Sequence, residues 1–399
     1  MSSPPLRVMF LTPYFRPYLG GIERAIERLS FGLMETSSVE AVGVLTTKYA
    51  FPLVPHPEWS NRDSTPEGIS IFRLKGWPQH SVPLYSVPLV WFSPWQVKRY
   101  LDEFKPNIVH FVGDGWFWGH FWSWFWYRHR AEFIFTPSYH TLPVTRWWLR
   151  PINGFICNVM DHVVSLTHQE AQQVHRDYWA PRQKQVVIGW GASPLSQLPP
   201  ELHKETITIL CVGRLGWHKG QDWLLKVYQQ ARANFKFPTR LVLVGQDEGE
   251  EESLKAWVKV SGFHSEVLFT GELGDADLAR WYLQADIFTL FSHYEAFGLV
   301  FFEAMVCEMP VLTHDVGANR ELLTQGSVVV PRFDQQAAAD QLVRLVNDPE
   351  YRQRLGREAK EYALKEFTWS AVAGKYLDLY QTPLRGSIDG PPRARRGRS

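Results

Sequence analysis

The chain has 399 residues and 45% hydrophobic content, which is enough for two domains that each bury their own core. With 42 basic and 41 acidic residues the formal charge is +1, so no overall field favours nucleic acid as a partner. The three cysteines are far apart in apolar segments, which argues against a disulfide framework or a metal site and leads us to expect a cytoplasmic protein. The first apolar run is interrupted by Arg7 and Pro13, so we expect neither a signal peptide nor a membrane span there.

Strand-type and helix-type segments alternate along the chain, which predicts parallel sheets with crossover helices. A strand at residues 7–12 precedes a loop with Gly20 and Gly21 and an amphipathic helix at residues 22–34. The glycines let the backbone approach a phosphate across a cleft, although a plain strand-to-helix turn is the alternative. Further strands are predicted at residues 41–46, 69–74, 107–112, 132–136, 162–166 and 185–188.

An aromatic-rich segment at residues 116–130 ends in Arg128, His129 and Arg130 and is too short to span a membrane. One interpretation is an interfacial helix that inserts its aromatic side chains into an anionic membrane and places its cations at the headgroups. This would make the protein peripheral on the inner face of the membrane. The other interpretation is an internal helix whose aromatic side chains pack against the sheet. Residues 147–150 repeat the pattern.

His140 follows the end of the strand predicted at residues 132–136. A histidine at that place can donate to a sugar hydroxyl or share positive charge with a reacting centre, and a structural role is the alternative. Residues 191–205 are rich in Pro, Gly and Ser and are predicted to be a linker.

After the linker the alternation starts again, with strands predicted at residues 207–212, 240–244, 266–269, 286–291, 310–313 and 327–330. From there the chain is predicted to be helical to about residue 380, and residues 383–399 are expected to form a disordered basic tail.

A glycine-rich loop at residues 213–220 follows the first strand of the second half. Gly213 frees the backbone to approach a phosphate, and Arg214 and Lys219 place two cations at the carboxyl end of a parallel strand. The spacing fits neither a Walker loop nor a GxGxxG fingerprint. A turn with solvated cations is the alternative.

Two glutamates eight residues apart, Glu295 and Glu303, flank the residues that open an apolar helix. Gly298 marks the start of that helix, whose free amides and positive dipole end suit an anionic ligand. Both carboxylates can then accept hydrogen bonds from one polyhydroxylated ligand with phosphates, which describes a nucleotide sugar. A solvated pair of glutamates beside an ordinary helix is the alternative.

Together these segments resemble the family 4 retaining glycosyltransferases of GT-B fold, over residues 7–380. The resemblance is carried by residues 18–24, 139–140, 212–220 and 244–245 and by the spacing of Glu295 and Glu303. It implies an α/β protein with two Rossmann-like parallel-sheet domains that face each other across a cleft. These would be residues 1–190, on the acceptor side, and 206–366, which bind the nucleotide sugar. A terminal helix at residues 367–382 would cross back to the first domain.

On this resemblance, Arg214 and Lys219 would bind the diphosphate, Glu295 the sugar hydroxyls and Glu303 the ribose. His140 would contact the donor sugar. Catalysis is thereby assigned to His140, Arg214, Lys219 and Glu295. Further donor-binding positions would be Gly20, Gly21, Gly213, Gly271, Leu273, Phe297, Gly298 and Leu299, with Gly271 to Leu273 at the base and Phe297 to Leu299 contributing amides.

The resemblance implies a metal-independent enzyme without a cofactor. It would move a hexose with retention of configuration from a UDP- or GDP-linked donor to a hydroxyl of a sugar or lipid-linked acceptor. A sugar-nucleotide 2-epimerase of the same fold and a non-catalytic subunit that binds sugar or lipid are the alternatives. The sequence leaves the base, the sugar, the acceptor and the linkage open.

Overall fold

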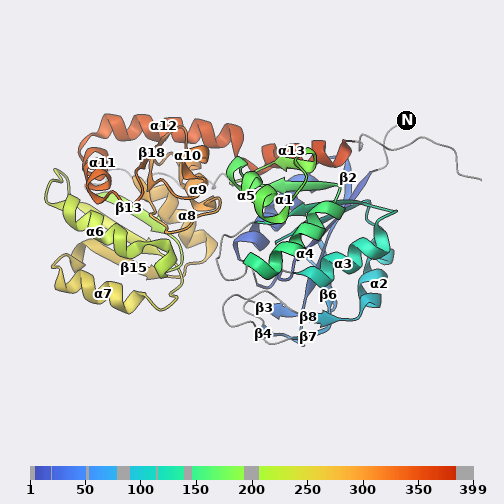
Figure 1. Ribbon diagram of the computed structural model, residues 1–399. Helices are drawn as coiled ribbons and strands as arrows, with labels where there is room; N and C mark the ends of the chain where they lie inside the picture. Colours follow the sequence, from blue (N-terminus) through green and yellow to red (C-terminus); the bar gives the residue numbers. More distant parts are fainter. Residues whose placement is uncertain are drawn as a thin grey trace, which may run out of the picture.

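The computed structural model describes residues 5–18, 20–50, 54–78, 90–113, 116–138, 146–192 and 206–382. Two α/β halves lie side by side, with the N-terminal half in blue to green and the C-terminal half in yellow to red (Figure 1). The expected α/β class with two Rossmann-like sheets is therefore confirmed. The linker beyond residue 192, His140 and the basic tail lie outside the described residues.

The N-terminal half is built on a sheet of eight strands that are parallel except for the edge strand β5. Apolar residues fill its central strands because helices cover both faces. In sheet order the strands are β12 (Gln185–Val187), β11 (His162–Ser165), β10 (Glu132–Thr136), β9 (Ile108–Val112), β1 (Leu6–Leu11), β2 (Val39–Thr47), β6 (Ser70–Leu74) and β5 (Arg62–Ser64). The helices are α1 (Gly21–Met34), α2 (Pro94–Phe104), α3 (Phe117–Tyr127), α4 (Arg146–Val159) and α5 (His168–Tyr178).

The C-terminal half contains a sheet of six strands, all parallel to their neighbours. Their order is β15 (Val267–Gly271), β14 (Thr239–Val244), β13 (Ile207–Val212), β16 (Ile287–Thr289), β17 (Val311–His314) and β18 (Ser327–Val330). The helices are α6 (Gln221–Arg232), α7 (Glu251–Val260), α8 (Asp275–Gln284), α9 (Leu299–Val306), α10 (Asn319–Leu322), α11 (Gln335–Asn347), α12 (Pro349–Glu366) and α13 (Trp369–Gln381).

The strand predictions are confirmed within a few residues. The stretch after residue 330 is helical, as predicted, but it is not continuous. It consists of α11, α12 and α13. Pro349 lacks a backbone donor and starts α12, with the Asp348 carboxylate accepting from the Tyr351 amide at 2.9 Å. Thr368 caps α13 in the same way. The antiparallel strand β5 and the short pairs β3 (Tyr49–Ala50) with β4 (Val54–Pro55) and β7 (Gly76–Pro78) with β8 (Val90–Phe92) were not predicted.

The last helix, α13, packs on the N-terminal half against α1 (Figure 1). Gly32 of α1 lets the two helices approach closely, since a side chain there would meet Ala373 at 2.9 Å. The Tyr380 hydroxyl lies 2.7 Å from Nδ1 of His110, a buried residue of β9. The chain thus passes between the halves twice, and the two passages touch where Ala192 pairs with Thr368.

Helix α3 combines features of both interpretations of the aromatic segment. It does cover the sheet, but its buried face consists of Gly119, His120, Ser123 and Tyr127. The His120 ring stacks on Phe111 with centroids 4.4 Å apart. Phe125 is exposed, and six further rings of α3, at positions 117, 118, 121, 122, 124 and 126, are only partly buried. Five of these rings, at positions 117, 118, 122, 124 and 126, pack part of their surface against the buried core and leave the rest exposed.

Burial lowers the pKa of His110 and of His120 to about 3. Both rings are therefore neutral in the folded protein, whereas the unfolded chain takes up a proton at each below about pH 6.5. We predict that stability falls as the pH drops from 6.5 toward 3, by up to about 1.4 kcal/mol per pH unit for each histidine.

His120→Phe removes one of these groups without breaking a hydrogen bond to any described residue, since neither ring nitrogen of His120 has a partner among them. We expect the variant to lose about 2 kcal/mol less than the wild type between pH 7 and pH 5 in urea unfolding. His129→Gln, at an exposed site, serves as the control. Equal losses in the wild type and His120→Phe would contradict the assignment.

Candidate functional site

The cationic loop predicted at residues 213–220 lies at the carboxyl end of β13, the central strand of the C-terminal sheet. A short 3₁₀ turn, Trp217–Lys219, leads to Gly220, which begins α6 in a left-handed conformation with φ 66°. No side chain could occupy that place, because it would lie 2.1 Å from the Phe291 carbonyl. The loop is therefore fixed against the chain that carries Glu295.

Lys219 and Glu295 form the central ion pair of the site. Nζ of Lys219 lies 2.9 Å from Oε2 of Glu295, and the Ser292 hydroxyl donates to the same oxygen at 3.3 Å. Both side chains are largely buried, so solvent screens their interaction less than that of a surface pair. An anion that enters here would meet a cation already held in place.

Arg214 points to a second carboxylate, that of Glu248 in the loop after β14, with which it forms an ion pair. Nδ1 of His218 lies 3.6 Å from the other oxygen of the same carboxylate. Burial lowers the pKa of His218, and the charges of Lys219 and Arg214 add to this effect. Three basic side chains of one loop are thus balanced by Glu295 and Glu248.

Glu303 lies in the second turn of α9 and accepts a hydrogen bond from the Tyr282 hydroxyl of α8 at 2.8 Å. Burial raises the pKa of this carboxyl group, against the effects of the Tyr282 bond and of the positive charges of Arg24 and Arg28. Both arginines belong to α1 of the N-terminal half. The start of α1 therefore faces Glu303 across the gap between the halves.

The loop with Gly20 and Gly21 is the element of the N-terminal half that meets this site. Burial raises the pKa of Glu23 to about 7, although the amides of Glu23 and Gly20 donate to its carboxylate. Tyr18 lies close enough to the Arg214 and Glu248 side chains for their charges to act on its pKa, which burial raises. Arg24 also forms an ion pair with Asp275 at the start of α8, at 2.9 Å.

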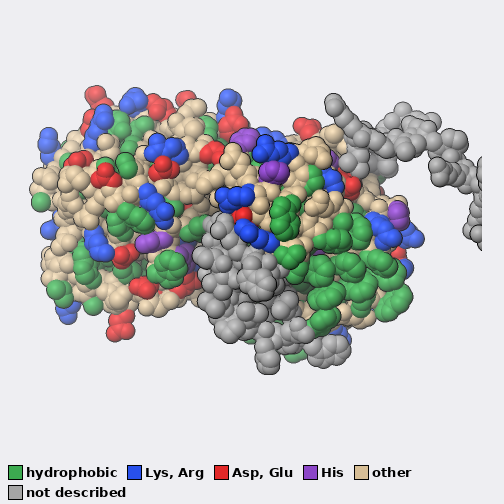
Figure 2. All heavy atoms as spheres, in the orientation of Figure 1, with side chains coloured by type: hydrophobic (Ala, Val, Ile, Leu, Met, Phe, Trp, Pro, Cys, Tyr) green, Lys and Arg blue, Asp and Glu red, His purple; other side chains and the backbone are tan. Residues whose placement is uncertain are grey.

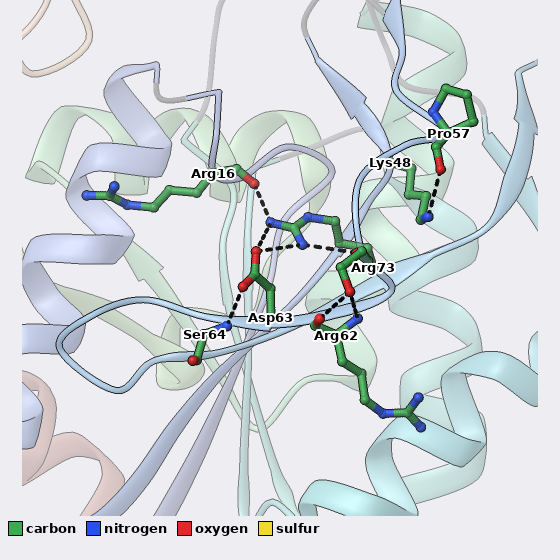
Figure 3. Close-up of polar contacts among 8 residues, drawn as sticks. Arg16, Lys48, Pro57, Arg62, Asp63, Ser64 and Arg73 are labelled. Carbon is green, nitrogen blue, oxygen red and sulfur yellow. Dashed lines mark hydrogen bonds and ion pairs between the residues drawn. The ribbon is translucent and has the colours of Figure 1, made fainter.

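Arg73 of β6 supports the chain segment that leads into the loop with Gly20 and Gly21 (Figure 3). Its guanidinium is 2% exposed and donates to the Arg16 carbonyl at 2.8 Å and to Asp63 at 3.3 Å. Because a buried cation is costly when unpaired, these partners hold Arg73 and, through the Arg16 carbonyl, the chain just before Gly20.

Close packing of neighbouring residues fixes the start of α9. Gly298 adopts a left-handed conformation with φ 75° and begins the helix as predicted. Gly317 packs so closely that a side chain there would lie 1.9 Å from the Glu295 carbonyl. The Phe297 ring is buried, packs on Phe302 and fills the space left by Gly189. Glu295 is thereby fixed on a rigid support.

A cavity of about 280 Å³ opens beside Glu295, between α5 of the N-terminal half and the loops of the C-terminal half. Its N-terminal wall includes Thr167 and Gln173, and its C-terminal wall includes Tyr294 and Arg332. The cavity is polar on both sides and lies between the halves, as expected for a ligand that both contact.

The structure brings Lys219 and Glu295 into contact, pairs Arg214 of the same loop with Glu248, and joins Glu303 to Tyr282. Gly213 lies in the loop of Arg214, and its amide donates to the Val244 carbonyl. Gly271 and Leu273 lie at the end of β15, where the Gly271 carbonyl accepts from the Gly245 amide at 3.0 Å. His140 lies outside the described residues, so its place in the site stays a prediction.

Sequence reasoning missed Glu248 and Tyr282, the partners of Arg214 and Glu303. Glu248 could have been found, because residues 245–249 form a glycine-flanked acidic loop directly after a strand that ends at the same sheet edge. Tyr282 left no such signal, since a tyrosine in an amphipathic helix is common in a core.

Two family models match this chain. The model described as glycosyl transferases group 1 matches residues 197–362, and that described as glycosyl transferase 4-like domain matches residues 20–191. Together they span nearly all of both halves. The chain belongs to the group 1 glycosyltransferases.

Among curated relatives, D-inositol 3-phosphate glycosyltransferase from Xylanimonas cellulosilytica is 31% identical over 240 residues, covering 55% of this chain and 56% of the relative. Phosphatidyl-myo-inositol mannosyltransferase from Mycobacterium leprae is 32% identical over 44% of this chain and 46% of the relative. The chain thus spans about half the length of the curated relatives it matches.

Solved structures agree on the fold. Sucrose-phosphate synthase from Thermosynechococcus elongatus aligns with a TM-score of 0.73 and 21% identity over 95% of this glycosyltransferase and 98% of that chain. HepE from Anabaena in complex with UDP-glucose aligns with a TM-score of 0.70 and 17% identity over 94% and 99%. At these identities the likeness establishes the two-domain GT-B fold.

The ion pair between Arg214 and Glu248 leads to a prediction about anion binding. Glu248→Gln frees the guanidinium, so an entering anion no longer competes with a carboxylate. We expect the variant to bind inorganic diphosphate up to about fivefold more tightly, the range for a partly exposed pair, as measured by calorimetric titration. Glu251→Gln, which breaks the Lys255 pair on α7, should leave binding unchanged. Weaker binding in Glu248→Gln would instead mean that Glu248 is needed to position Arg214.

Proposed function

We propose that this protein is a retaining hexosyltransferase that uses a nucleoside-diphosphate sugar and acts on an acceptor hydroxyl. The observation that carries the proposal is the ion pair between Lys219 of the glycine-rich loop and Glu295, which directly precedes the start of α9. Lys219 contacts Glu295 directly, while Glu303 lies eight residues further along the same segment. Cations suit a diphosphate, and fixed carboxylates suit the hydroxyls of a sugar and a ribose.

In this proposal Arg214 and Lys219 exchange their carboxylate partners for the diphosphate, with the amides of Phe297, Gly298 and Leu299 beside it. Glu295 accepts hydrogen bonds from the sugar, and Glu303 from the ribose. The base lies at Gly271 to Leu273, in the loop after β15. Gly20 and Gly21 approach the diphosphate from the opposite half, and His140 contacts the donor sugar. HepE, a structural neighbour, was solved with UDP-glucose, which supports a donor of this class.

The transfer proceeds by front-side attack. The bond between the anomeric carbon and the diphosphate oxygen breaks, and the acceptor oxygen forms the new bond on the same face of the sugar. The acceptor proton passes to the departing diphosphate. Arg214 and Lys219 stabilise the negative charge that develops on this leaving group, which is where fixed cations lower the barrier. The three cysteines are free thiols, which is consistent with a cytoplasmic location for this chemistry.

Lys219→Ala tests the donor site. We expect the wild type to bind either UDP or GDP in a calorimetric titration. The variant should bind that nucleotide at least about tenfold more weakly, because a charge-assisted contact is lost. Lys226→Ala is the matched control, since Lys226 lies on α6 and pairs only with exposed Asp222 among the described residues.

Absence of binding of both nucleotides to the wild type would reject the donor site. Product analysis with the nucleotide sugar that binds then separates the rival activities. Transfer to an added acceptor supports the proposal, an isomerised nucleotide sugar would indicate an epimerase, and binding without turnover would indicate a non-catalytic subunit.

Chelation tests the proposed independence from metal. Since Arg214 and Lys219 supply the positive charge at the leaving group, EDTA should leave the rate of transfer within about twofold of its starting value. Loss of turnover in EDTA that manganese restores would overturn this part of the proposal.

A further inference from the structure

The outward side of α3 is the most aromatic surface of the described residues, and it continues onto neighbouring elements. Trp91 of β8 packs on Trp118 with centroids 4.7 Å apart, and Trp95 of α2 packs on Trp126 at 5.1 Å. Phe155 of α4 contacts Trp124 on the other side. We call this set, with the outward rings of α3, the aromatic surface. Figure 2 shows hydrophobic side chains gathered over this face of the N-terminal half.

The aromatic surface inverts the usual pattern of a helix on a sheet, in which large apolar residues face inward and polar residues face solvent. Here the small and polar residues of α3 face the sheet, while Trp95 remains 65% exposed and Phe125 39% exposed. Most rings of α3 pack partly on the core, and the apolar surface that remains exposed is contiguous with Trp91, Trp95 and Phe155, which favours a partner that covers it.

The chemistry of the aromatic surface favours a lipid headgroup region over another protein. Its large side chains are mainly indoles, which combine an apolar body with one polar N–H and concentrate where a membrane meets water. Aromatic residues and Arg are also enriched at protein interfaces, so the choice of a bilayer rests on the combination of indoles with the arginines that border the surface. None of the helices in the described part of the chain is long and apolar enough to cross a membrane.

Arginines border the aromatic surface and supply charge complementary to anionic lipids. The Arg128 guanidinium lies over the Trp124 and Phe125 rings, at 5.3 and 5.2 Å, and forms no ion pair with a described residue. Arg99 lies one helical turn beyond Trp95, is exposed, and forms no ion pair with a described residue, although its charge acts on Glu103. The nearby acidic groups, Asp102 and Glu103, are neutralised by Arg130 and Arg62.

The position of α3 connects this surface to the cleft. The helix follows β9, so it starts at the carboxyl edge of the sheet, where Gly113 lies beside Ile22 of α1. Its eleven residues extend roughly 16 Å from that edge. A molecule held in a membrane against α3 could therefore present a hydroxyl near the loop with Gly20 and Gly21.

We propose that the aromatic surface docks this protein on an anionic lipid bilayer, and that the acceptor is a lipid or a lipid-linked sugar held in that bilayer. The choice of acceptor rests on the proposed glycosyl transfer; the docking itself does not. Indole and phenyl rings enter the interface between headgroups and acyl chains, while Arg99 and Arg128 lie among the lipid phosphates.

Flotation of the full chain with vesicles tests the docking without any donor or acceptor. We expect the wild type to float with vesicles of phosphatidylcholine and phosphatidylglycerol. Replacing Trp95 and Phe125 together by Ser should weaken binding roughly tenfold, and Arg128→Glu should weaken it roughly thirtyfold on anionic vesicles but little on phosphatidylcholine alone. Phe237→Ser is the matched control, because Phe237 is 41% exposed on the other half.

Two results would overturn the proposal. One is a wild type that floats with neither kind of vesicle. The other is a wild type that sediments as a dimer which Trp95→Ser with Phe125→Ser dissociates, since the aromatic surface would then join two copies of the chain. Titration of UDP and GDP into the lipid-free protein is unaffected by either result, so failure of docking and failure of the donor site can be told apart.

Discussion

Parallel strand pairing is what gathers the functional residues of this protein, because all strands of a parallel sheet end at the same edge. In the C-terminal sheet, β13, β14 and β15 pair in this way, and the loops that follow them carry Arg214, Glu248 and Leu273. In the N-terminal sheet the same rule places the loop after β1 beside the start of α3. The side chains converge although their positions in the sequence are far apart.

The charges in the cleft are already ordered before any ligand is bound. Lys219 and Arg214 are each held by a carboxylate, and Glu303 by the Tyr282 hydroxyl. Such pairs fix long side chains in one geometry and so reduce the entropy that ligand binding would otherwise cost. The same pairs must partly open when an anion enters. Its affinity therefore depends on how much stronger its contacts with the cations are than the ion pairs that they replace.

Much of this arrangement could be predicted from sequence because it depends on local signals. Alternating strands and helices gave the two sheets, and Gly298 gave the start of α9. The partners of the site residues could not be predicted in the same way. Glu248 and Tyr282 meet Arg214 and Glu303 only through the tertiary fold. The division of the C-terminal helical stretch was missed because Asp348 and Pro349 were not interpreted as a helix start.

The two passages of the chain between the halves meet where Ala192, the last described residue before the linker, pairs with Thr368 at the start of α13. A single covalent connection between two domains permits rotation about several axes. Two connections that are hydrogen-bonded to each other restrict the domains mainly to rotation about one axis. Opening and closing of the cleft should therefore follow a single path, and each closure should return Gly20 to the same position opposite Glu303.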